Sequence, residues 1–231
     1  MGKYALVAST EEVGPLTHGD DLNIPISVMG ITRKGDDGRR FIVDAGWPLK
    51  VPLTVDMEGL DEGSAALLHG IVKAIQPSVC LETGTHKGRS TQAILSALVG
   101  GQRGHLWTVD KEEFGVQVSG ALSPTEIKRA TFNIGETPHC LDQLLYSNDN
   151  ICGISELIDF AYLDGGHEEM ILLAEMVWVE KHGADNLVMV IDNTLDPGWP
   201  GVPKAIDKFL ETQSWEVITL PTMTGFTLLR R

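Results

Sequence analysis

The sequence predicts an α/β fold in which helices cover both faces of a mostly parallel sheet. From residue 61 onward, short apolar runs alternate with helical segments, a pattern typical of parallel sheets whose connections are helices. The last two predicted strands are joined only by residues 221–224, and so short a connection permits a hairpin but not a parallel crossover. The predicted fold is therefore a doubly wound sheet with one antiparallel edge strand.

The individual elements follow from the spacing of apolar residues and from turn signals. Asp61 is placed to cap a helix over Glu62–Ile75, which ends before Pro77. The strands expected after this helix are 78–82, His105–Asp110, Ala130–Ile134, 157–163, 186–191, 215–220 and 225–229. Further helices are expected at 90–98, 123–129, 168–182 and 202–211.

Residues 1–60 have a different pattern and are predicted to be an extension of the domain formed by residues 61–231. Segments 25–34 and 40–45 flank the sequence Gly-Asp-Asp-Gly at 35–38, which has the turn chemistry of a β-hairpin. Residues 46–60 contain several prolines and glycines and are expected to connect this hairpin to the domain.

Composition limits the classes of function. The 231 residues include 18 basic and 32 acidic side chains, a formal charge of −14 that repels phosphate backbones and argues against a nucleic-acid partner. The N-terminus has no apolar signal-peptide core, and no apolar run approaches the ~18 residues that span a bilayer. The three cysteines form no CxxC pair. We therefore expect a cytoplasmic protein with no membrane partner and with reduced thiols.

Acids, an amide and glycines stand at the carboxyl ends of the predicted strands, at the edge of the sheet where ligands bind in such folds. The positions concerned are Glu82, Asp110, Gly135 and Glu136, Asp164, and Asp192 with Asn193. This grouping at one edge is the main indication of a functional site.

The first strand–loop–helix unit, LETGTHKGRS at 81–90, has the features of a ligand-binding loop. Its glycines allow a sharp turn and a close approach of the backbone to a ligand, and Ser90 with the helix amides suits a carboxylate. The loop has neither the GxGxxG nor the P-loop pattern, which disfavours a nicotinamide dinucleotide. Asp110, 26 residues after Gly84, is placed to accept hydrogen bonds from ribose hydroxyls, with a turn-capping role as the alternative.

A second group of residues suits a hard metal ion. Asp164, Asp192 and Asn193 follow two strands and supply the carboxylate and amide oxygens that Mg²⁺ prefers. His167, three residues after Asp164, is a candidate general base because a histidine titrates near neutral pH. The alternatives for His167 are a role in orienting the loop or holding the metal, and a helix-start residue without chemistry.

Over about residues 60–231 these motifs resemble the class I S-adenosylmethionine-dependent methyltransferases, whose fold is Rossmann-like. Within that class they are similar to the metal-dependent small-molecule O-methyltransferases of the catechol O-methyltransferase type and to the bacterial sugar and macrolide relatives. The spacing from Glu82 to Ser90 and the separation of 28 positions from Asp164 to Asp192 match the catechol type, whereas His167 stands where that type has a lysine. The resemblance implies cofactor-binding roles for Glu82, Gly84, Thr85, Gly88, Ser90, Asp110, Gly135, Glu136 and Asp164.

The expected function is methyl transfer from S-adenosylmethionine to a hydroxyl of a small molecule. Asp164, Asp192 and Asn193 would bind Mg²⁺, and His167 would be the catalytic base. Two alternatives stay open: a metal-independent methyltransferase with His167 as sole base, and a non-enzymatic scaffold with a nucleotide-binding fold. Catechol, sugar and polyketide hydroxyls all fit as acceptors. Residues 1–60 are expected to cover the acceptor pocket or to mediate homo-oligomer formation, with a passive extension as the alternative.

Overall fold

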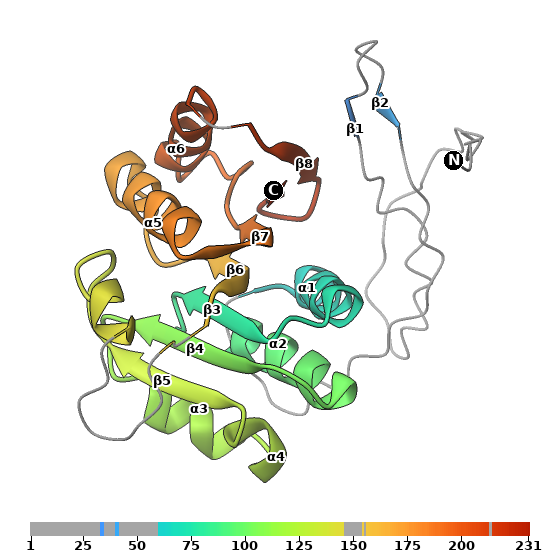
Figure 1. The fold of residues 1–231 in the computed structure, drawn as a ribbon, viewed down its shortest axis with the longest axis vertical. Coiled ribbons are helices and arrows are strands. Elements are labelled where there is room, and N and C mark those ends of the chain that lie inside the picture. Colours follow the sequence, from blue (N-terminus) through green and yellow to red (C-terminus); the bar gives the residue numbers. More distant parts are fainter. Residues whose placement is uncertain (1–32, 35–39, 42–59, 146–153, 155, 213) are drawn as a thin grey trace.

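The computed structural model describes residues 33–34, 40–41, 60–145, 154, 156–212 and 214–231. A seven-stranded sheet with the order β5-β4-β3-β6-β7-β9-β8 forms its centre (Figure 1). Its strands are β3 (Val79–Thr83), β4 (His105–Asp110), β5 (Ala130–Ile134), β6 (Ile158–Leu163), β7 (Gly183–Ile191), β8 (Glu216–Leu220) and β9 (Phe226–Arg230). The pairs formed among strands β3 to β7 are all parallel, which confirms the predicted mostly parallel sheet.

The single antiparallel strand is β9, which lies between β7 and the edge strand β8. Helix α6 (Gly201–Leu210) connects β7 to β8, which lies two positions away from β7 in the sheet. The turn after β8 then places β9 in the position between these two strands. The predicted hairpin is therefore confirmed, and the edge strand that it creates runs in the same direction as β7.

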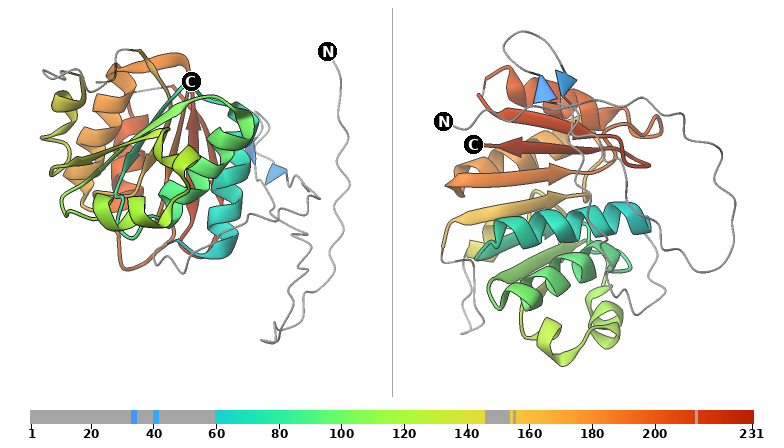
Figure 2. Two further views of the ribbon diagram at one scale, coloured as in Figure 1. Left: turned by 90° about the horizontal axis from the view of Figure 1, so that it is seen from below. Right: turned by 90° about the vertical axis from the view of Figure 1, so that its right-hand side faces the viewer.

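Helices cover both faces of the sheet, as the doubly wound prediction requires (Figure 2). Helices α1 (Glu62–Ile75), α2 (Arg89–Gly101) and α3 (Gly115–Ala121) contribute to one apolar core, and α5 (Glu169–Lys181), α6 and the 3-10 helix η1 (Leu141–Leu145) contribute to the other. Strand β7 shows why two cores form: Leu187, Met189 and Ile191 belong to one, whereas Val188 and Val190 belong to the other. Side chains of a strand alternate between its two faces.

Helix boundaries follow the capping signals in the sequence. The Asp61 carboxylate accepts hydrogen bonds from the amides of Gly63 and Ser64 and begins α1. Ser123 and Glu126 form a capping box that begins α4 (Pro124–Ile127). The sequence did not predict α3 or η1, because both are short and α3 contains glycine and valine, which are weak helix formers.

The N-terminal extension contains two short strands, β1 (Arg33–Lys34) and β2 (Arg40–Phe41), which pair antiparallel. This pairing confirms the centre of the predicted hairpin. The outer parts of that prediction, 25–32 and 42–45, and the connection at 46–59 lie outside the described residues. None of the helices that the structure describes combines the length and apolar character needed to cross a membrane.

Candidate active site

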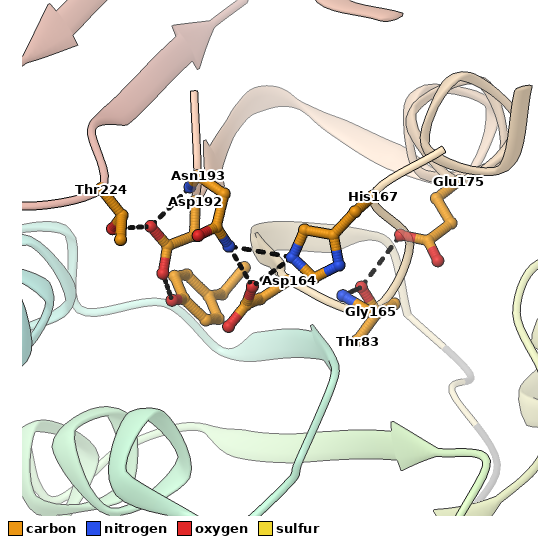
Figure 3. Close-up of polar contacts among 9 residues, drawn as sticks. Thr83, Asp164, Gly165, His167, Glu175, Asp192, Asn193 and Thr224 are labelled. Atoms are coloured by element: carbon orange, nitrogen blue, oxygen red, sulfur yellow. Dashed lines mark hydrogen bonds and ion pairs between the residues drawn. The ribbon is translucent and has the colours of Figure 1, made fainter. Parts of the chain in front are cut away.

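Polar side chains at the carboxyl ends of β6 and β7 form a hydrogen-bonded cluster (Figure 3). Asp164 follows β6, and Asp192 and Asn193 follow β7, which pairs with β6. The side-chain amide nitrogen of Asn193 donates to Asp164 Oδ1 over 2.8 Å. The sequence prediction that these strand ends meet at one edge is therefore confirmed.

His167 belongs to the same cluster. Its Nε2 lies 3.3 Å from Asp164 Oδ1 and 2.9 Å from the side-chain nitrogen of Asn193. The imidazole ring stacks on the indole of Trp199, with 4.3 Å between ring centroids and 26° between planes. Burial raises the pKa of Asp164, and the hydrogen bond from His167 opposes this rise. A carboxylate beside Nε2 stabilises the protonated imidazole, as a general base requires.

Asp192 is buried and accepts three hydrogen bonds. Tyr162 donates its hydroxyl to Oδ2 over 2.9 Å, while the Asn193 backbone amide and the Thr224 hydroxyl each donate to Oδ1 over 2.6 Å. Burial, and then the charge of nearby Asp164, raise the pKa of Asp192 to about 6. A buried carboxylate whose pKa is raised further by a second carboxylate lies where positive charge is stabilised.

The donor set fits a hard divalent cation, with one condition. Asp164, Asp192 and Asn193 offer oxygen ligands of the type that Mg²⁺ binds. In the present arrangement Asn193 turns its amide nitrogen toward Asp164, so binding of a metal requires rotation of the amide to present oxygen. Among the described residues, no group of three or more His, Cys, Asp or Glu side chains is arranged to hold a metal. The amide oxygen is therefore essential to any such site.

A cavity of about 260 Å³ opens beside the end of β4. It is lined by Thr85, Asp110, Glu112, Glu113, Gly115, Ser119, Phe132, Asn133 and Ile134. Two lining residues, Thr85 and Asp110, are among the predicted cofactor-binding residues. Glu112 and Glu113 were missed, although two acids directly after a strand that already ends in an acid are visible in the sequence.

Backbone amides fix the carboxylate of Asp110. Its Oδ2 accepts from the amide of His86 over 2.8 Å, and its Oδ1 accepts from the amide of Glu112 over 2.9 Å. Each oxygen of a carboxylate has two lone pairs, so both retain capacity for a further donor. The turn-capping role and a ligand-binding role for Asp110 are therefore compatible.

Glu82 and Ser90 lie in the interior and do not line the cavity. Glu82 belongs to β3 and is fully buried, with Thr91 Oγ1 donating to its Oε2 over 2.7 Å. Burial raises the pKa of Glu82 to about 7, against the opposing effect of hydrogen bonds from Thr108, Thr91 and Ser90. The Ser90 hydroxyl is thus directed toward this carboxyl group.

Three predicted glycines allow loops to touch. A Cβ on Gly84, whose φ is +87°, would lie 2.5 Å from the backbone oxygen of Asp164. A Cβ on Gly88 would meet Val118, and one on Gly135 would meet Cys140. Gly84 therefore brings the loop after β3 into direct contact with the loop that carries Asp164. Glu136, also a predicted cofactor residue, is exposed on the loop that follows β5.

Three residues that support the cluster were not predicted: Tyr162, Thr224 and Glu175. Glu175 is buried on α5, although the sequence places this acid on the apolar stripe of the helix between Leu172 and Val179. That conflict between charge and position is a signal which sequence inspection could have found.

Comparisons with known proteins agree with this geometry. A family model described as "Methyltransferase domain" matches residues 81–194, which run from within β3 into the loop after β7. No curated protein matches the chain.

Several solved structures share the fold. One is the O-methyltransferase TomG from Streptomyces achromogenes in complex with SAM, with a TM-score of 0.60 and 21% identity over 74% of this chain and 81% of that chain. A second is an O-methyltransferase from Bacillus cereus in complex with SAH, with a TM-score of 0.58, 18% identity, and coverage of 75% and 83%. A third is the SAH-bound methyltransferase PaMTH1 from Podospora anserina, with a TM-score of 0.56, 16% identity, and coverage of 74% and 79%. These similarities show the fold.

Proposed function

We propose that this chain, a methyltransferase of the class I fold, transfers the methyl group of S-adenosylmethionine to a hydroxyl of a small molecule. The observation that carries the proposal is the position of two features at one edge of the sheet. One is the acid-lined cavity after β4, and the other is the imidazole–carboxylate–amide cluster after β6 and β7. At Gly84, the loop after β3, which lines the cavity with Thr85, contacts the loop that carries Asp164.

The cavity supports the choice of cofactor. Asp110 retains hydrogen-bonding capacity for ribose hydroxyls, and Glu112 and Glu113 add negative charge to the same lining. A sulfonium cofactor is cationic, whereas the phosphates of a dinucleotide would be repelled by three carboxylates. The fold neighbours bound to SAM or SAH support the same choice.

The cluster supports a simple displacement. The acceptor oxygen bonds to the methyl carbon as the carbon–sulfur bond breaks, and the electron pair of that bond stays on sulfur. Once the Asn193 amide has turned its nitrogen away from Nε2, His167 takes the hydroxyl proton at that atom, and the adjacent Asp164 carboxylate stabilises the imidazolium. The products are a methyl ether, S-adenosylhomocysteine and a proton that His167 releases to solvent. The side chains supply orientation and proton transfer, since the sulfonium is already electrophilic.

We further propose that Asp164, Asp192 and Asn193 hold Mg²⁺, which would lower the pKa of the acceptor hydroxyl. A metal-independent enzyme with His167 as sole base is the second candidate. One observation favours it: Asp192 already accepts hydrogen bonds from Tyr162, Asn193 and Thr224, and Asn193 already donates to Asp164.

Exposed apolar side chains near the cluster suggest how an acceptor is held. Trp199 stacks on His167, and Leu195 and Met223 are exposed on the adjoining loops. The Leu195 amide donates to the Thr224 carbonyl over 2.9 Å, so the loop after β7 and the β8–β9 turn lie together. An acceptor with an apolar or aromatic part would cover this surface.

The proposal is tested in two steps. Calorimetry should show that S-adenosylmethionine binds, and that Asp110→Ala weakens it by the loss of hydrogen bonds to a charged group, each worth about 1.5–3 kcal/mol. Preferential binding of NAD would overturn the cofactor assignment. A panel of hydroxylated small molecules is then assayed for methyl transfer with Mg²⁺ and with excess chelator; full activity in chelator would favour the metal-independent candidate.

The base is tested with a matched pair of variants. His167→Ala should lower the rate about 10²–10⁴-fold, with partial recovery at high pH, where the acceptor ionises unaided. His182→Ala is the control, since His182 lies at the far end of α5 and contacts the Trp178 carbonyl. Equal rates for the two variants would assign the base to another group.

A further inference from the structure

Glu175 occupies a position where a carboxylate is costly. It lies on α5 among Leu172, Met176 and Val179, and it is fully buried. A buried carboxylate is tolerated only where hydrogen bonds replace those it made to water. Glu175 must therefore be explained by the donors that it binds.

Both carboxylate oxygens of Glu175 accept from threonine hydroxyls, one at the end of a strand and one in a loop. Thr83, the last residue of β3, donates to Oε2 over 3.0 Å, and Thr137, in the loop after β5, donates to Oε1. Strands β3 and β5 are separated in the sheet by β4. The Glu175 side chain thus joins the end of β3 to the loop after β5.

Thr83 extends this connection to the loop that carries Asp164 and His167. Its Oγ1 accepts from the backbone amide of Gly165 over 3.3 Å (Figure 3). A Cβ on Gly165 would lie 3.0 Å from that of Thr83, and a Cβ on Gly166 would lie 3.2 Å from Glu175 Oε1. The backbone between Asp164 and His167 therefore rests directly on Thr83 and Glu175.

We propose that Glu175 is a positioning residue for the transfer reaction: through Thr83 it fixes the Asp164–His167 loop against the end of β3. A carboxylate only accepts hydrogen bonds, so the Thr83 hydroxyl must donate to Glu175 and offer its lone pairs to Gly165. The direction of each hydrogen bond in this chain is thereby set. The catalytic role rests on the proposed function, whereas the support of the loop does not.

The electrostatic surroundings are consistent with this role. Burial raises the pKa of Glu175 to about 7, opposed by the hydrogen bonds from Thr137 and Thr83 and by the charge of His167. The negative charge of Asp164 also raises the pKa of Glu175. The hydrogen bonds from Thr137 and Thr83 therefore favour the ionised carboxylate that burial disfavours.

The decisive experiment measures amide hydrogen exchange without substrate. Thr83→Val keeps the shape of the side chain but removes the hydroxyl, and Thr83→Ser keeps the hydroxyl. Protection of the Gly165 amide should fall about 10-fold or more in Thr83→Val and in Glu175→Gln, and it should be retained in Thr83→Ser. The control is Glu169→Gln, which changes a partly exposed acid on the same helix that is paired with Lys208. Unchanged protection in Thr83→Val would overturn the proposal, even if Glu175→Gln failed to fold.

Kinetics tests the catalytic part separately. Thr83→Val and Glu175→Gln should each lower kcat about 10–100-fold through misplacement of His167, with a smaller change in KM for the cofactor. The double variant should lose little more than either single variant, because both break the same chain of hydrogen bonds. Additive losses would overturn the role through Thr83. Altered exchange without any methyl transfer by the wild type would instead contradict the proposed function.

Discussion

Gly84→Ala tests whether the two halves of the site are in contact as the structure shows. The added Cβ would lie 2.5 Å from the Asp164 carbonyl oxygen and 2.7 Å from its carbon. Both atoms belong to the backbone, so no side-chain rotation can relieve the overlap. The residue also adopts φ of +87°, which alanine disfavours by about 1–2 kcal/mol.

Overpacking of a close contact adds about 1–3 kcal/mol, so the free energy of unfolding should fall by about 2–5 kcal/mol. The measurement is urea denaturation followed by circular dichroism, with methyl transfer assayed on the folded variant. Gly100→Ala is the control, because a Cβ at that helical position meets nothing within 4 Å and should stabilise α2 by about 0.5–1 kcal/mol. A Gly84→Ala variant with wild-type stability and wild-type turnover would refute the contact between these loops.

Three further predictions concern burial, pH and the extension. Tyr162→Phe removes the buried donor to Asp192 Oδ2 and should cost about 1.5–3 kcal/mol in urea denaturation; a loss within error of zero would show that this hydrogen bond contributes nothing. Burial raises the pKa of Glu82 from 4.5 to about 7, so the folded state binds a proton at this side chain more tightly than the unfolded state does. The resulting stabilisation is fully present below pH 4.5 and is lost as the pH rises through about 7. Glu82→Gln should remove that dependence, a difference on the order of 3 kcal/mol between these pH values, and parallel stability curves would contradict it. A chain that begins at Asp61 should bind cofactor yet lose turnover or change its mass in solution; full activity at unchanged mass would leave residues 1–60 as a passive extension.

Local signals were sufficient for the main elements and for the edge where the site lies. Asp61 caps its helix as the sequence indicates, and Asp164, Asp192 and Asn193 meet because parallel strands end at the same edge. For Glu82 and Ser90, the spacing along the chain did not predict that both side chains are buried. Strand β3 extends to Thr83, so Glu82 lies within the strand and its side chain is buried beneath α2 with Thr91. Spacing along the chain did not determine which face of the strand receives the side chain.

Long-range partners were not predictable from local pattern. Thr224 lies between two strands at the end of the chain, and no local feature links it to Asp192. The link arises from topology: β9 runs antiparallel beside β7, and Thr227 pairs with Ile191. The turn that precedes β9 therefore arrives at the edge where β7 ends, and the Thr224 hydroxyl reaches Asp192 Oδ1. Insertion of β9 between β7 and β8 thus makes the terminal hairpin part of the site, which explains why a sheet with one reversed strand can support this cluster.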